Sequence, residues 1–223
     1  MDPSELAAEA LRVYRRYAIE IVEGFGLCPW AERARKSGRV AERVLLQKSS
    51  DPTAALDCVR TLGTDPNVEI GLLIFPRLTI GHLAFEHFTA LVREQDAQRH
   101  PLGAIQFAMA AFHPEAEADL SNPERLIPFL RRTPDPTIQL VRRSALDKVR
   151  GKSSQGTGFV DPTALGALEA LALTGETHDE LSLRERIARH NHETVLAAGV
   201  DELRARLLDI HSDRRLAYAR LGE

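Results

Sequence analysis

A cysteine next to a proline is the residue of this chain best suited to chemistry. Cys28 stands in the segment Gly26-Leu27-Cys28-Pro29-Trp30-Ala31, where one helical pattern ends and another begins. Proline is favoured at the first helical position, so Cys28 is expected at or beside the N-cap. Free N–H groups and the helix dipole favour a thiolate there. We therefore predict a reactive thiol, against the alternative of a buried cysteine that packs beside Trp30.

His113 is the second candidate, because it directly follows an apolar run, residues 104–112, that is typical of a buried central strand. Ligands of open sheets with crossover helices gather beyond the carboxyl ends of such strands. Pro114 keeps the backbone of His113 extended. We predict a general base for Cys28 or a metal ligand at this position. The alternative is a histidine that only hydrogen-bonds a turn.

Two further segments offer groups that bind or orient a substrate. Arg131-Arg132-Thr133-Pro134 puts two guanidinium groups beside a rigid proline turn, an arrangement suited to clamping a carboxylate or phosphate. We assign substrate binding to Arg132 and Thr133, and expect Arg131 to be a solvated basic helix end. Asn191 lies in a helical stretch and is predicted to contact the substrate or to orient a histidine. Sequence order neither supports nor excludes a Cys/His/Asn arrangement.

Strands and helices alternate in the part of the chain that carries Cys28, His113 and Arg132. Aliphatic density indicates strands at 43–47, 68–75, 104–112 and 137–142. Apolar side chains at three- and four-residue spacing indicate helices at 3–23, 54–62, 80–98, 182–198 and 201–221. We expect an α+β (or α/β) fold, with an open, mostly four-stranded sheet covered by helices and a helical C-terminal extension.

The chain is predicted to have three parts. Residues 1–150 form an α/β sheet domain that carries the site, 151–178 a glycine-rich loop and linking helix, and 179–223 C-terminal helices packed on the sheet domain. The loop contains Gly151-Lys152-Ser153, but a phosphate-binding P-loop needs a glycine where Leu146 stands. We therefore interpret the loop as flexible rather than as a nucleotide site.

Composition indicates a soluble, cytoplasmic protein. The net charge of −3 gives no attraction to nucleic acid or to an anionic membrane, and no apolar run is long enough for a membrane helix. The two cysteines lack CxxC spacing and are expected to be reduced, with Cys58 packed in the core. The N-terminus lacks the basic-then-apolar order of a signal peptide. Nothing in the sequence indicates a cofactor or an oligomeric state.

Taken in order, these segments resemble a bacterial family known as domain of unknown function 1415. Its members carry G-L-C-P-[FW]-A, F-H-P and N-R-[ST]-P-x-P-T motifs, and the resemblance covers about residues 10–196. Arg131 stands where the third motif has asparagine, and the loop between 150 and 179 departs from the pattern. The resemblance implies no activity, but it points to the matching positions, which are Cys28, Pro29, His113, Pro114, Arg132, Pro134, Pro136 and Thr137.

The leading hypothesis is a cysteine-dependent hydrolase or transferase that acts on a small anionic substrate. Cys28 is its nucleophile, His113 its acid or base, and Arg132 binds the anionic group. One alternative is a non-catalytic protein that binds a metal, such as zinc or copper, or a small ligand through Cys28 and His113. Another is a partner-binding protein whose motif residues only hold turns together. That alternative predicts an unreactive Cys28 and no deep pocket around it.

Overall fold

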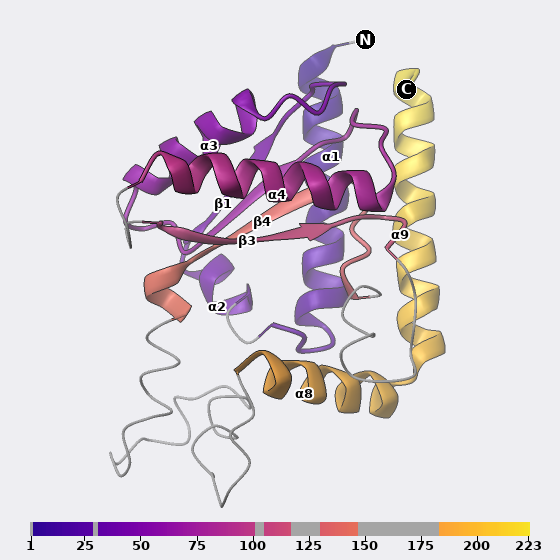
Figure 1. Cartoon of the computed structure of the whole chain (residues 1–223). Helices are drawn as coiled ribbons and strands as arrows, with labels where there is room; N and C mark the ends of the chain where they lie inside the picture. The colour runs from indigo at the N-terminus through magenta and orange to yellow at the C-terminus, as the bar shows by residue number, and fades with distance from the viewer. Residues whose placement is uncertain (1, 29–30, 101–104, 117–129, 147–182) are drawn as a thin grey trace, which may run out of the picture.

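The computed structural model describes residues 2–28, 31–100, 105–116, 130–146 and 183–223 (Figure 1). Within these ranges, none of the helices combines the length and apolarity needed to cross a membrane. The glycine-rich loop and linking helix predicted at 151–178 lie outside the described residues, as do Pro29 and Trp30.

A four-stranded mixed sheet forms the centre of the fold (Figure 1). Its spatial order is β1-β2-β4-β3, and the strands are β1 (Val40–Val44), β2 (Ile70–Ile74), β3 (Phe107–Phe112) and β4 (Thr137–Arg142). β1 and β2 are parallel, whereas β4 runs antiparallel to both of its neighbours. The α+β fold with four strands is therefore confirmed, and the predicted strand 137–142 matches β4.

Two strand predictions were wrong in detail. β1 begins at Val40 rather than Arg43, because its parallel register pairs Val40 with Ile70 and ends opposite Ile74. Pro76 has no N–H with which to continue that ladder. β3, expected at the centre of the sheet, lies at its edge, since β4 inserts between β2 and β3. The apolar character of β3 therefore comes from packing on a helix layer rather than from a central position.

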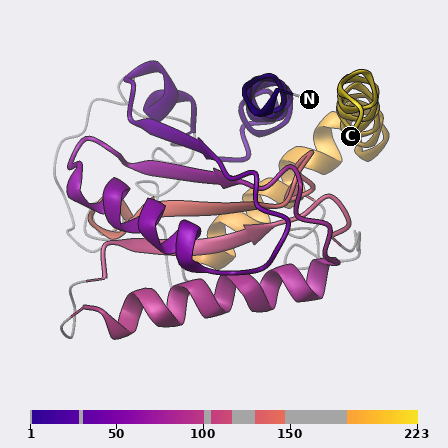
Figure 2. The same ribbon diagram turned by 90° about the horizontal axis from the view of Figure 1, so that it is seen from above.

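Helices cover both faces of the sheet. Figure 2 shows α3 (Thr53–Thr64) and α4 (His82–Gln98) on one side, and α1 (Pro3–Tyr17) and α9 (Val200–Leu221) on the other. The β2 strand, predicted to be buried on both faces, divides its side chains between the two layers. Ile70, Leu72 and Ile74 pack with α1 and α9, and Leu73 packs with α3 and α4. That prediction is confirmed.

The first helix changes from an α-helix to a π-helix before the chain reaches Cys28. Asp2 caps α1 by accepting from the N–H of Ser4, and α1 continues directly into the π-helix η1 (Ala18–Glu23). In η1 each N–H reaches five residues back, as from Gly24 to the carbonyl of Ile19 at 2.9 Å. The chain then turns at Gly26, whose φ of 60° favours glycine. Cys28 therefore follows a wide helical turn, and the short helix α2 (Ala31–Lys36) begins after it.

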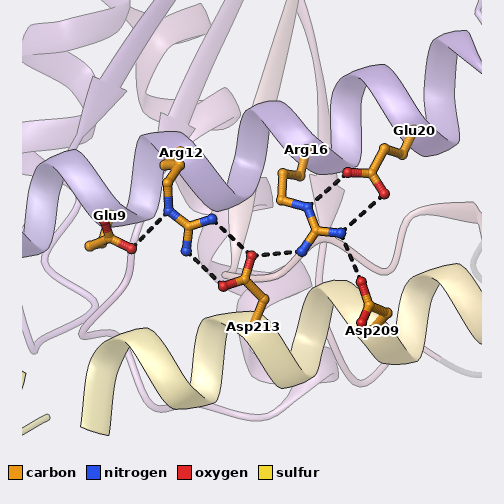
Figure 3. Close-up of polar contacts among 6 residues, drawn as sticks. All are labelled: Glu9, Arg12, Arg16, Glu20, Asp209 and Asp213. Carbon is orange, nitrogen blue, oxygen red and sulfur yellow. Dashed lines mark hydrogen bonds and ion pairs between the residues drawn. The ribbon is translucent and has the colours of Figure 1, made fainter. Parts of the chain in front are cut away.

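The C-terminal part is helical, as predicted, and consists in its described residues of α8 (Leu183–Ala198) and α9. α1 and α9 run antiparallel side by side, so both termini lie at the same end of the molecule (Figure 1). Figure 3 shows the ion pairs between them. Asp213 accepts from Arg12 at 2.7 Å and from Arg16 at 2.6 Å, and Arg16 also contacts Asp209 at 2.8 Å. These pairs fix α9 along α1.

Acid is expected to weaken the α1–α9 contact. Hydrogen bonds from Arg12 and Arg16 hold the pKa of Asp213 well below its ordinary value of 3.8. The stabilisation is therefore complete above about pH 4 and is lost as the pH falls through the folded-state pKa. Because Asp213 is partly exposed, we expect a loss of about 1 kcal/mol or less in the free energy of unfolding.

Urea unfolding measured from pH 7 to pH 3 tests this expectation. The Asp213→Asn variant should lack this part of the acid dependence. Asp57→Asn is the matched control, because Asp57 pairs only with Arg60 of the same helix among the contacts of the described residues. An acid dependence that is identical in the wild type and in Asp213→Asn would contradict the role of this network.

Candidate functional site

A pocket of about 660 Å³ lies between the sheet and the first helix. Its floor is the sheet face turned toward α1, and its wall is the π-helical segment η1. The floor residues come from three strands: Val40, Glu42, Ile70, Leu72, Gln139 and Val141. The wall residues are Ala18, Ile19, Val22 and Glu23. π-Helical turns are rare and frequently occur at functional sites, so the wall itself marks this pocket.

Cys28, Arg131 and Asn191 all line this pocket, although they come from three distant parts of the chain. Cys28 is partly exposed, and its carbonyl accepts from the N–H of Ala31 at 3.2 Å. The Arg131 guanidinium lies over the Phe112 ring, 5.3 Å from its centroid. Asn191 enters from α8 and is 7% exposed. A thiol, a cation and an amide therefore meet in one cavity.

The remaining charges of the described lining pair with one another. Arg15 contacts Glu42, and Arg35 donates to Glu23 at 2.6 and 2.7 Å. Arg131 is the third arginine of the described lining. The pocket therefore combines a largely aliphatic floor with charged side chains around it, which suits a ligand that has both apolar and polar parts.

Two buried tyrosines support the segment that carries Arg131. The Tyr17 hydroxyl donates to the carbonyl of Leu130 at 2.6 Å, and the Tyr14 ring packs beside Tyr17. Burial raises the pKa of both phenols, and the charge of Arg131 opposes this shift at Tyr17. Both phenols therefore stay protonated near neutral pH. The bond to Leu130 positions the neighbouring Arg131.

His113 lies in a different cavity, of about 560 Å³, which is lined by the segment before α4 and by residues 208–215 of α9. Its Nε2 bonds the carbonyl of Ile80 at 2.9 Å, and its Nδ1 accepts from the N–H of Glu115 at 3.1 Å. Burial lowers the pKa of His113, which favours the neutral ring. Both ring nitrogens therefore serve backbone groups, and the predicted pairing with Cys28 gains no support from this geometry.

Strand alternation explains why His113 does not line the Cys28 pocket. Successive side chains of a strand point to opposite faces. Phe107 and Met109 of β3 pack in the α3–α4 core, so His113, in the same register, falls on that side and contacts Phe85 of α4. Phe112 has the opposite register and lines the Cys28 pocket. This alternation of odd and even positions is the sequence signal that could have assigned His113 to the face of the sheet opposite the Cys28 pocket.

Arg132 and Thr133 hold the turn before β4 instead of lining the Cys28 pocket. The Nε of Arg132 donates to the carbonyl of Ala116 at 2.6 Å. Thr133 is fully buried, and its hydroxyl donates to the carbonyl of Asp135 at 2.7 Å. Of these two neighbouring arginines, Arg131 lines the pocket, whereas the sequence predicts a solvated helix end at Arg131. The assignment of substrate binding to Arg132 and Thr133 stays a prediction.

The described residues do not contain a group of three or more His, Cys, Asp or Glu side chains that could hold a metal ion. Cys28 and His113, the ligands of the metal-binding alternative, line separate cavities. Cys58, by contrast, lies on α3 against the α3–α4 core, and burial raises the pKa of its thiol. The two cysteines therefore occupy different environments.

A family model described as "Protein of unknown function (DUF1415)" matches residues 10–157. No curated protein and no solved structure matched the chain. The family match spans the sheet, the Cys28 turn and the Arg131 segment, and it ends before α8. Its description carries no activity, so any assignment of function starts from the pocket.

Proposed function

The chain belongs to the DUF1415 family, and we propose that it acts as a cysteine-dependent hydrolase or transferase on a small anionic substrate with an apolar body. The observation that supports this proposal is the convergence of Cys28, Arg131 and Asn191 on one pocket of about 660 Å³. Small-molecule sites are commonly concave, mostly apolar and equipped with a few polar groups, as this pocket is.

Each group has a defined part in the proposed reaction. The Cys28 thiolate attacks an acyl carbon of the substrate, the leaving group departs, and a thioester forms. Water, or an acceptor molecule in a transferase, then releases the acyl group and restores the thiol. Arg131 binds the anionic group of the substrate and favours the thiolate form of Cys28. His113 has no part in this scheme, because both of its ring nitrogens bond backbone groups.

A binding protein without catalysis is the second candidate. The observation that favours it is the absence of histidine from the described residues that line the pocket. A cysteine nucleophile is commonly activated by an adjacent base, and a ligand-binding pocket needs none. In this case Arg131 and Asn191 would bind the same kind of molecule and Cys28 would only pack against it.

The reactivity of Cys28 toward iodoacetamide tests the proposed nucleophile. We expect Cys28 to be alkylated at least about tenfold faster than Cys58 at pH 7, because thiolate content and access decide the rate. Burial raises the pKa of the Cys58 thiol and so disfavours its thiolate. Peptide mass mapping over time gives both rates within one sample.

Three variants control this measurement. Cys58→Ser should leave the Cys28 rate unchanged, and Arg131→Gln should slow it several-fold by removing the positive charge of the pocket. Arg60→Gln is the matched charge control, since Arg60 is exposed on α3 and does not line the pocket. Equal rates at the two cysteines, or a Cys28 rate indifferent to Arg131→Gln, would refute the proposed nucleophile.

A further inference from the structure

The hydroxyl of Tyr14 is a hydrogen-bond donor that no group of the described residues uses. Tyr14 is 4% exposed and lines the Cys28 pocket. Its hydroxyl makes no hydrogen bond within the described part of the chain, and it is not fully enclosed, unlike the Oδ1 of Asn191. Buried polar groups are nearly always paired, because leaving one unpaired costs free energy. The hydroxyl of Tyr14 therefore points to a partner that enters the pocket.

The neighbouring Tyr17 differs from Tyr14 in this respect. Its hydroxyl already donates to the carbonyl of Leu130 at 2.6 Å. Burial raises the pKa of both phenols, and a negative charge on Cys28 raises it further. Both rings therefore lie within electrostatic reach of the thiol, and Tyr14 is the one that keeps a protonated, unengaged O–H.

We infer that the Tyr14 hydroxyl donates a hydrogen bond to the oxygen anion that forms when Cys28 attacks an acyl carbon. This inference rests on the proposed function and adds a catalytic residue to it. Donors aimed at such an anion commonly supply a large part of the rate of acyl transfer.

The electrons of this step balance without any further reactant. The thiolate sulfur of Cys28 forms a bond to the acyl carbon, and one electron pair of the carbonyl double bond moves to its oxygen. Tyr14 donates to that oxygen and keeps its proton. When the carbonyl forms again, the bond to the leaving group breaks, and that group takes the electron pair with it.

The test compares two reactions of Cys28, of which only one forms an oxygen anion. Acylation by 4-nitrophenyl butyrate forms it, whereas alkylation by iodoacetamide displaces iodide from a saturated carbon. In the Cys58→Ser chain, Tyr14→Phe should slow acylation about 100-fold, the loss typical of removing one such donor, and should slow alkylation less than about threefold. The neutral butyryl group makes this comparison independent of the charge of Arg131.

Tyr218→Phe is the matched control, because it also removes one buried phenol hydroxyl but lies outside the Cys28 pocket. It should leave the ratio of the acylation rate to the alkylation rate unchanged. Damage to the pocket by Tyr14→Phe would slow both reactions together, so this ratio separates a hydrogen bond to the anion from a structural role.

A second measurement uses the unmodified Tyr14. In O-(4-nitrophenyl) thionobutyrate, sulfur replaces the carbonyl oxygen and is a much weaker hydrogen-bond acceptor. Relative to N-acetylcysteine in solution, Cys28 should prefer the oxygen ester over the thiono ester by at least about tenfold more.

The inference is overturned if Tyr14→Phe slows both reactions equally or neither, or if Cys28 and N-acetylcysteine discriminate equally between the two esters. These outcomes differ from a failure of the proposed function. Release of 4-nitrophenolate that persists in Cys28→Ser would refute the nucleophile. Release that requires Cys28 but is indifferent to Tyr14→Phe would refute only the part assigned to Tyr14.

Discussion

Replacing Asp135 with alanine is expected to lower the free energy of unfolding by about 3–5 kcal/mol, the cost typical of breaking a buried ion pair. Asp135 is 1% exposed, and its carboxylate accepts from the Nε of Arg214 at 2.7 Å and from the Tyr218 hydroxyl at 2.6 Å. The alanine variant leaves two donors of α9 without this acceptor. It therefore detaches α9 from the turn that precedes β4.

The electrostatics of Asp135 predict which of its variants loses more free energy of unfolding. Burial raises the pKa of this carboxyl above its ordinary value, although Arg214 and Tyr218 act against the shift. A neutral asparagine avoids burying the charge and keeps one acceptor, so Asp135→Asn should cost less than Asp135→Ala. Urea unfolding followed by circular dichroism gives both values.

Asp57→Ala is the control for this series, because Asp57 is exposed on α3 and pairs only locally in the described contacts. It should change the free energy of unfolding by no more than about 0.5 kcal/mol. A loss below about 1 kcal/mol for Asp135→Ala would show that the buried pair does not hold α9 in place.

The same turn connects stability with the pocket. The hydroxyls of Thr133 and Thr137 both donate to the carbonyl of Asp135, at 2.7 and 2.9 Å. Arg131 lies two residues before Thr133, and its carbonyl accepts a hydrogen bond from the N–H of Thr133 at 2.9 Å. These bonds hold the proline-rich turn in place, and Arg131 lies at its first residue.

Local patterns predicted most of the secondary structure. The strand 137–142 and the helices 182–198 and 201–221 agree with β4, α8 and α9 within a residue at each end. Each of these elements buries one face, and its apolar residues therefore recur at a regular spacing that can be read from the sequence. The insertion of β4 between β2 and β3 depends on which strands pair, and no local pattern contains that information.

Local patterns point to only one part of the candidate site, the turn at Cys28. The break between two helices at Cys28 is a local signal, and the structure describes a pocket beside it. Which distant residues share that pocket depends on strand register and on the docking of α8. A shift of one residue exchanges Phe112 for His113 at the pocket, because successive side chains along a strand point to opposite faces.

Acylation of Cys28 by an activated substrate is the other large effect that we expect. The probe is 4-nitrophenyl hydrogen glutarate, a half-ester with a carboxylate for Arg131 and a short aliphatic chain for the pocket floor. Attack by the Cys28 thiolate releases 4-nitrophenolate and leaves a glutaryl thioester, which water converts to glutarate and the free thiol. The Cys28→Ser variant should lose this reaction essentially completely.

The controls separate a specific site from general thiol chemistry. Cys58→Ser should react like the wild type, because Cys58 lies against the α3–α4 core and outside the pocket. The neutral probe 4-nitrophenyl butyrate should react more slowly than the half-ester. Arg131→Gln should remove that difference, since only the carboxylate benefits from the charge of Arg131.

The central claim is that Cys28 is the nucleophile of the pocket it lines, and stoichiometry with intact-protein mass spectrometry tests it most directly. We expect the wild type to release at least one equivalent of 4-nitrophenolate per chain and to carry the glutaryl group on Cys28. Release at the wild-type rate from Cys28→Ser, or a glutaryl group found on Cys58 alone, would contradict the claim.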